Sequence, residues 1–170
     1  MIIELAADAT CGQAAVGDLG CGAGYYLAGV LDQLAGARGL GLDTSVRALR
    51  AAARAQDRGA AVAWDVFRPL PLVGGAGDAA LNVFAPRNPE FHSVLRPVGR
   101  LIVVRPTSRH LAELRGRLTG MVTIDSAKEQ RLHRALDRFF KAAVTEQADP
   151  ATLSRLDALD LVAMSRAHVT

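Results

Sequence analysis

Short apolar runs alternate with helical patterns along the first 120 residues. Five of these runs are typical of short buried strands bounded by Gly, Asp or Pro, namely residues 14–19, 38–42, 60–64, 79–84 and 101–105. Apolar residues at three-to-four spacing predict helices over 25–35, 45–56, 89–94 and 108–118. Parallel strands need crossover connections, which helices supply. The pattern therefore predicts an α/β fold with a doubly wound, mostly parallel sheet of Rossmann type.

The pattern loosens after Gly120. We expect a helix over 126–136, a sixth strand over 139–147 and a helix over 150–164 with Pro150 at its start. No strand-like segment follows, so the sheet is expected to be incomplete at its C-terminal end. An unpaired strand favours association, and we expect a homodimer. The expected organisation is a single domain over 1–170, with a core at 14–120 and a looser part at 121–170.

Composition restricts the class of protein. The chain has 170 residues, of which 50% are hydrophobic and 22% charged, and its mean hydropathy is +0.16. Such a chain can bury enough apolar surface to fold, which excludes global disorder. No apolar run reaches the roughly 18 residues of a membrane span, and the first residues lack a secretory signal. We expect a cytoplasmic protein without a membrane partner.

Cysteine spacing and charge add two expectations. Cys11 and Cys21 form no Cys-x-x-Cys pair and have no His at ligand spacing, so we expect no metal site. Residues 96–141 hold eleven Lys or Arg against four Asp or Glu. This asymmetry fits either attraction of RNA or the solvated faces of surface helices.

A glycine-rich loop follows the first predicted strand. The segment 18–26 reads Asp-Leu-Gly-Cys-Gly-Ala-Gly-Tyr-Tyr and leads into a predicted helix. Glycines permit a tight turn and close approach of a ligand, while the helix N-terminus offers N–H donors to an anionic group. The dinucleotide fingerprint is Gly-x-Gly-x-x-Gly, whereas here Gly20, Gly22 and Gly24 alternate, two residues after Asp18.

Asp43 ends the second predicted strand, where a nucleotide cofactor presents its ribose. A carboxylate at this position accepts hydrogen bonds from both ribose hydroxyls. The alternative is a helix N-cap shared with Thr44 or Ser45, and the two roles are compatible.

The loop and its preceding acid resemble those of class I S-adenosylmethionine-dependent methyltransferases. The resemblance implies S-adenosylmethionine as the cofactor, with Asp18 close to its methionine part. Asp65 resembles the family's acid that meets the adenine amino group, with a solvated loop carboxylate as the alternative. The cofactor contacts implied in this way are Asp18, Gly20, Cys21, Gly22, Gly24, Tyr25, Asp43, Thr44, Asp65, Val66 and Asn82.

In that family the end of the fourth strand faces the methyl acceptor. The acceptor pocket implied here consists of Asn82, Phe84, Ala85, Pro86, Arg87, Arg109 and His110. Phe84 as a core residue and His110 as a helix cap are the alternatives. Residues 95–101 resemble the family's Leu-Arg-Pro-Gly-Gly turn, with Val98 in place of a glycine. No residue is identified as a catalytic base.

Three segments resemble one particular family within the class I methyltransferases. Residues 18–26, 84–88 and 105–114 together resemble the bacterial 23S ribosomal RNA (guanine-N1)-methyltransferases, which include macrolide-resistance enzymes. The resemblance implies methyl transfer to a guanine of ribosomal RNA, with Arg87, Arg105 and Arg109 along an RNA path. That family's N-terminal zinc module and last antiparallel strand have no counterpart in this sequence.

Three other functions remain as alternatives. A catalytically silent module would keep the cofactor loop without transferring a methyl group. A small-molecule methyltransferase would use the same cofactor without RNA. A nicotinamide oxidoreductase is disfavoured by the glycine spacing.

Overall fold

The computed structural model describes residues 1–10, 14–85, 90–117, 126–148 and 150–166. The chain divides into two compact units, unit 1 (Met1–Arg105) and unit 2 (Pro106–Thr170). Each unit is described by itself.

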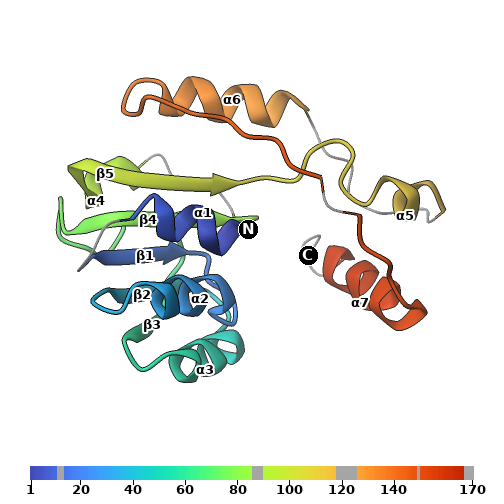
Figure 1. Cartoon of the computed structure of the whole chain (residues 1–170), viewed down its shortest axis with the longest axis horizontal. Helices are drawn as coiled ribbons and strands as arrows, with labels where there is room; N and C mark the ends of the chain where they lie inside the picture. Colours follow the sequence, from blue (N-terminus) through green and yellow to red (C-terminus); the bar gives the residue numbers. More distant parts are fainter. Residues whose placement is uncertain (11–13, 86–89, 118–125, 149, 167–170) are drawn as a thin grey trace. The chain divides into compact units, whose positions relative to one another are not determined.

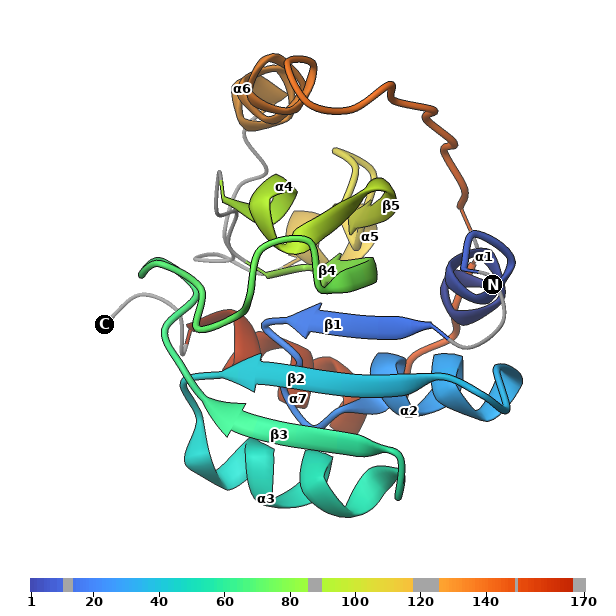
Figure 2. The ribbon, with the colours of Figure 1, turned by 90° about the vertical axis from the view of Figure 1, so that its left-hand side faces the viewer.

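A five-stranded parallel sheet forms the centre of unit 1. Its strands are β1 (Ala15–Leu19), β2 (Arg38–Asp43), β3 (Gly59–Ala63), β4 (Gly77–Val83) and β5 (Leu95–Val104), in the order β3-β2-β1-β4-β5. The predicted doubly wound α/β fold and all five predicted strands are confirmed. Figure 2 shows β1, β2 and β3 side by side with their arrowheads at the same end. The strand order reverses between β1 and β4, which is where open α/β sheets bind ligands.

The described residues of unit 1 form the helices α1 (Ile2–Asp8), α2 (Tyr25–Gln33), α3 (Val46–Ala55) and α4 (Phe91–Val94) (Figure 1). The last three were predicted, although α2 ends two residues early. Helix α1 was not predicted; it packs against α2 and contributes the fully buried Ala6 to the core. The Ser45 hydroxyl caps α3 by accepting from the Ala48 N–H at 3.3 Å.

The core of unit 1 lies between the sheet and its helices. It contains Val16, Leu27, Val30, Leu31 and Leu81, each at most 5% exposed. The Arg58 guanidinium closes the C-terminal end of α2 by donating to the carbonyls of Leu34 and Ala37, at 2.7 and 2.9 Å. Because the Leu34 carbonyl also accepts from the Ala37 N–H, Arg58 braces the turn that follows α2.

Two expectations about strands need correction. The prediction of a buried strand at β3 was wrong, because β3 is an edge strand and Ala60, Val62 and Ala63 are exposed. The turn expected over 95–101 lies inside β5 instead. There the pairing with β4 shifts, so that Gly77 pairs with Leu95 and Ala79 with Arg100. The residues of β5 between Leu95 and Arg100 therefore form an irregularity in the strand pairing.

Unit 2 contains α5 (Ala112–Arg117), α6 (Ser126–Leu136) and α7 (Arg155–Arg166). Helix α6 confirms its prediction. The sixth strand predicted over 139–147 was wrong: these residues form no strand, and residues 141–148 are all exposed. An apolar pattern makes a strand only where a partner strand accepts its hydrogen bonds.

The predicted start of the last helix was also wrong. Helix α7 begins at Arg155 rather than at Pro150. The Ser154 hydroxyl accepts from the Asp157 N–H at 3.2 Å, and Asp157 Oδ2 accepts from the Ser154 N–H at 3.0 Å. This reciprocal cap satisfies the first helical donors and sets the start of α7.

Candidate functional site

The glycine-rich loop lies at the carboxyl ends of β1 and β2. The N–H groups of Gly20 and Cys21 both donate to the Leu42 carbonyl, at 2.8 and 3.0 Å. Gly20 has a φ of +92°, and a Cβ on it would lie 2.4 Å from the Ala85 Cβ. The loop therefore lies directly against the segment that follows β4, and only glycine fits at this contact.

Asp43 fastens the loop from the end of β2. Its Oδ2 accepts from the Gly22 N–H at 2.9 Å and its Oδ1 from the Ser45 N–H at 2.8 Å. The carboxylate thus holds both the loop and the start of α3, while Thr44 is exposed. Two carboxylate oxygens offer about four acceptor positions, so Asp43 keeps capacity for two hydroxyl donors.

Asp18 is a buried carboxyl beside this loop. It is 1% exposed, and its Oδ2 has no hydrogen-bond partner among the described residues. Burial, together with the negative charge of Asp43, raises the pKa of Asp18 to about 7, and a hydrogen bond from the Leu27 backbone partly opposes this. Asp18, in β1, therefore keeps one buried oxygen that has no partner among the described residues.

Cys21 and Tyr25 differ in their exposure. Cys21 is buried, and burial raises the pKa of its thiol to about 12, which keeps it protonated and unreactive at neutral pH. Tyr25 is 70% exposed. Its ring meets that of Tyr26 edge to face, with centroids 5.2 Å apart. Gly24 caps α2 in the left-handed conformation.

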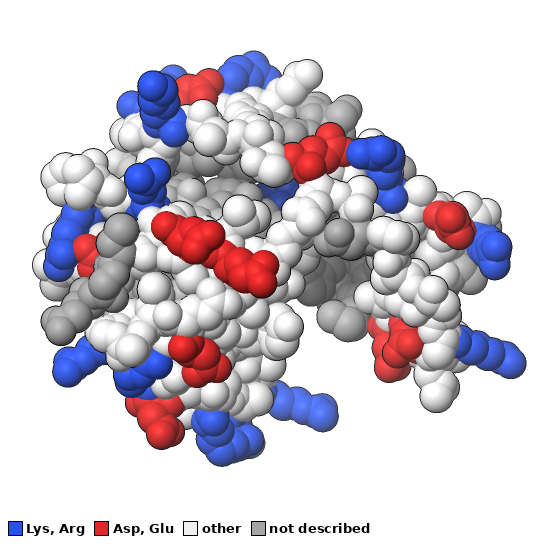
Figure 3. Space-filling model, viewed as in Figure 1, with Lys and Arg blue, Asp and Glu red and all other residues white. Residues whose placement is uncertain are grey.

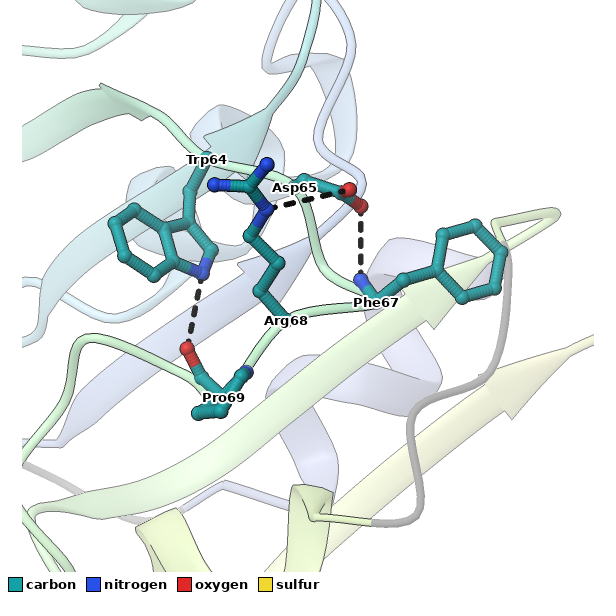
Figure 4. A network of polar contacts seen from close by, with 5 residues as sticks. All are labelled: Trp64, Asp65, Phe67, Arg68 and Pro69. Atoms are coloured by element: carbon teal, nitrogen blue, oxygen red, sulfur yellow. Dashed lines mark hydrogen bonds and ion pairs between the residues drawn. The ribbon is translucent and has the colours of Figure 1, made fainter.

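Asp65 and Val66 lie in the loop after β3. Figure 4 shows that Asp65 Oδ1 accepts from the Phe67 N–H, at 2.9 Å, while Oδ2 lies 4.0 Å from Arg68 Nε. The Trp64 indole donates to the Pro69 carbonyl at 3.1 Å. The Asp65 side chain is 41% exposed and Val66 is buried. Asp65 therefore shapes its own loop and keeps an accessible oxygen.

Asn82 is the most buried of the predicted acceptor residues. Its side chain is 0% exposed, donates to the Leu19 carbonyl at 3.0 Å and accepts from the Arg105 guanidinium at 2.6 Å. Phe84 is 49% exposed with a φ of +54°, which excludes the alternative that its side chain belongs to the core. Ala85 lies against Gly20 and is 9% exposed.

The remaining acceptor candidates are not brought to this edge of the sheet by any described contact. Pro86 and Arg87 lie outside the described residues. Arg109 and His110 belong to unit 2, where Arg109 pairs with Glu146 at 2.6 Å. The side chain of His110 is exposed, and its backbone N–H closes a turn on the Thr107 carbonyl at 3.0 Å.

Sequence reasoning missed the role of Arg105. The sequence suggested a phosphate contact, whereas its guanidinium donates to Asn82 Oδ1 and to the Ala85 carbonyl. The only signal was an arginine at the end of the fifth strand, which does not by itself identify internal acceptors.

Metal ligation, membrane insertion and surface charge were searched over the described residues. No group of three or more His, Cys, Asp or Glu is placed to hold a metal ion there. No helix in the same part of the chain is long and apolar enough to cross a bilayer. On the face drawn in Figure 3, basic and acidic side chains are interspersed rather than gathered by sign.

Comparison with known proteins identifies relatives of this chain. The chain is 46% identical over 149 residues to a Micromonospora griseorubida protein assigned to the 23S rRNA (guanine-N(1)-)-methyltransferases, covering 86% of this chain and 50% of that protein. It is 47% identical over 141 residues to the 23S rRNA (guanine(748)-N(1))-methyltransferase of Streptomyces fradiae, covering 82% of this chain and 49% of the relative. The chain thus spans about half the length of these relatives. No protein-family model matches it.

Among solved structures, a chain from the Haloferax volcanii complex between the Trm112 methyltransferase activator and a methyltransferase superposes with a TM-score of 0.59. Its sequence identity is 23%, and the match covers 77% of this chain and 65% of that chain. This likeness concerns the fold. The chain is a homologue of the 23S rRNA (guanine-N1)-methyltransferases and has the class I methyltransferase fold.

Proposed function

We propose that this chain binds S-adenosylmethionine at the carboxyl edge of its sheet and transfers the methyl group to N1 of a guanine in 23S ribosomal RNA. One observation carries the proposal: identities of 46 and 47% to relatives named for this reaction, over more than four fifths of the chain. The geometry of unit 1 supports the cofactor part independently.

The residues at this edge fit such a cofactor. The loop at Gly22 is open, because a Cβ there would meet no described heavy atom within 4 Å. Asp43 is held by two backbone N–H groups with acceptor capacity left for ribose hydroxyls. Asp18 keeps an unpartnered oxygen beside the loop. These residues would hold the methionine and ribose parts, and Asp65 with Val66 would meet the adenine.

When bound, S-adenosylmethionine supplies an electrophilic methyl group on its sulfonium. The protein's task is then mainly to hold the acceptor nitrogen in line with that methyl group, at a separation of roughly 3 to 3.5 Å. The close approach of Gly20 to Ala85 brings the cofactor loop and the acceptor segment together. No described side chain is assigned the removal of the guanine N1 proton.

Calorimetric titration of the purified chain tests the cofactor assignment. We expect micromolar binding of S-adenosylmethionine and of its demethylated product, and no binding of NAD. NAD binding in place of both would support the oxidoreductase alternative. A folded chain that binds none of the three would overturn the proposal.

Asp43→Ala sharpens this test. Loss of hydrogen bonds to a charged group costs about 1.5–3 kcal/mol, so the dissociation constant for S-adenosylmethionine should rise about 10- to 150-fold. Asp57→Ala removes an exposed carboxylate near the same helix and should leave affinity unchanged. Equal affinities of the two folded variants would refute the ribose role of Asp43.

An RNA substrate has consequences for location and assembly. Action on ribosomal RNA implies a cytoplasmic location. The homodimer stays a prediction, which light scattering of the purified chain tests. Labelled product formed without RNA would instead favour a small-molecule acceptor.

A further inference from the structure

A chain of hydrogen bonds links the carboxyl ends of three strands. Arg105, the residue after β5, donates from Nη2 to Asn82 Oδ1 at 2.6 Å and from Nη1 to the Ala85 carbonyl. Asn82, fully buried in β4, donates in turn to the Leu19 carbonyl at the end of β1, at 3.0 Å. Leu19 directly precedes the cofactor loop. The Arg105 guanidinium thus connects the acceptor segment to the base of that loop.

The segment held by Arg105 is strained. Phe84 has a φ of +54°, a left-handed conformation that costs a non-glycine residue roughly 1–2 kcal/mol. Such a conformation persists only where the surrounding structure over-determines it. Two hydrogen bonds flank this residue. The Phe84 N–H donates to the Val104 carbonyl at 3.1 Å, and the carbonyl of the following residue, Ala85, accepts from Arg105.

We propose that Arg105 is a positioning residue that holds the Phe84–Ala85 segment against the cofactor loop and thereby fixes the acceptor side of the site. The effect of Arg105 on methyl transfer rests on the proposed function, whereas its hold on the Phe84–Ala85 segment does not. Without the guanidinium, the hydrogen bonds from Arg105 to the Ala85 carbonyl and to the buried Asn82 oxygen are lost. One of the two bonds that flank Phe84 is then missing, which weakens the hold on its left-handed conformation.

A planar guanidinium suits this task in a way that an ammonium does not. Arg105 reaches a side-chain amide and a main-chain carbonyl with two nitrogens of one rigid fork. Lysine offers one nitrogen and no fixed fork, so Arg105→Lys should not restore the positioning. A contact of Arg105 with an RNA phosphate, by contrast, would be largely preserved by lysine, which binds phosphate as a point charge.

Amide hydrogen exchange in the free chain tests the geometry without cofactor or RNA. In Arg105→Met and Arg105→Lys, the Phe84 amide should exchange at least tenfold faster relative to that of Leu81 in the middle of β4. Arg100→Met removes an exposed arginine from β5 and should leave the exchange of both amides unchanged. Unchanged protection of Phe84 in folded Arg105→Met would overturn the proposal.

Methyl-transfer kinetics test the catalytic consequence. We expect kcat to fall at least tenfold in both Arg105 variants, with the KM for RNA and its salt dependence unchanged. A raised KM, a shallower salt dependence and rescue by lysine would identify a phosphate contact and refute positioning. If the wild-type chain transfers no methyl group to RNA while the exchange result holds, the proposed function fails and the structural role of Arg105 stands.

Discussion

Asp18→Asn should remove a pH-dependent loss of stability that the native chain carries. The Asp18 carboxyl is 1% exposed, and burial followed by the charge of Asp43 raises its pKa to about 7. In the unfolded chain the pKa of an aspartate is about 3.9. Between these two pKa values, the native state therefore keeps the Asp18 proton while the unfolded state has released it.

The sign and size of the pH effect on the free energy of unfolding follow from this difference between the native and unfolded pKa values. Below about pH 4 the carboxyl is protonated in both states, and its contribution to stability is fully present. As the pH rises towards 7, the unfolded state ionises first and the free energy of unfolding falls by about 1.4 kcal/mol per unit. Over about three units the loss approaches about 4 kcal/mol, and above pH 7 to 8 it levels off. Asparagine does not titrate, so the variant lacks this loss.

Urea unfolding of wild type and Asp18→Asn at pH 4.5, 6.0 and 7.5 measures the effect. The difference in unfolding free energy between the two proteins should move in favour of the variant as the pH rises, by a few kcal/mol in total. Asp57→Asn, at an exposed position, should show a constant difference from wild type. A constant difference for Asp18→Asn as well would show that Asp18 ionises normally in the native state, and would refute the reasoning.

Two further substitutions with matched controls test the packing of unit 1 by urea unfolding. Gly20→Ala should cost about 2–4 kcal/mol, because its new Cβ lies 2.4 Å from the Ala85 Cβ at a φ of +92°, whereas Gly22→Ala, with open space around it, should cost only about 1 kcal/mol; equal costs would contradict the close approach. Arg58→Met should cost about 2 kcal/mol by removing the hydrogen bonds that the guanidinium donates to the Leu34 and Ala37 carbonyls, and the exposed Arg54→Met should cost almost nothing; a neutral Arg58→Met would show that water replaces the guanidinium.

The sheet and the cofactor loop were predictable because local signals and tertiary structure agree there. Apolar residues of the predicted strands 14–19 and 79–84, such as Val16, Leu19 and Leu81, are buried in the parallel sheet, as a short mostly apolar run indicates. Gly20 and Gly24 have positive φ at the strand-to-helix junction, which glycine adopts readily, so their spacing in the sequence predicted the loop. Asp43 was identified by its place at the end of a strand.

The false strand and the role of Arg105 depend on partners distant in sequence, whereas the start of α7 depends on a local cap. The apolar residues of 139–147 resemble a strand, but no described strand accepts their hydrogen bonds. Helix α7 begins at the Ser154–Asp157 cap, a short signal that Pro150 obscured. The acceptors of Arg105 lie 20 and 23 residues away along the chain, and no local pattern identifies them.

Transfer of a labelled methyl group from S-adenosylmethionine to 23S ribosomal RNA tests the central claim most directly. We predict that label enters the RNA and maps to N1 of a guanine, and that Asp43→Ala, which should bind the cofactor less tightly, incorporates less label than Asp57→Ala at limiting cofactor. A folded chain that binds S-adenosylmethionine but leaves every guanine of 23S RNA unlabelled would contradict the claim.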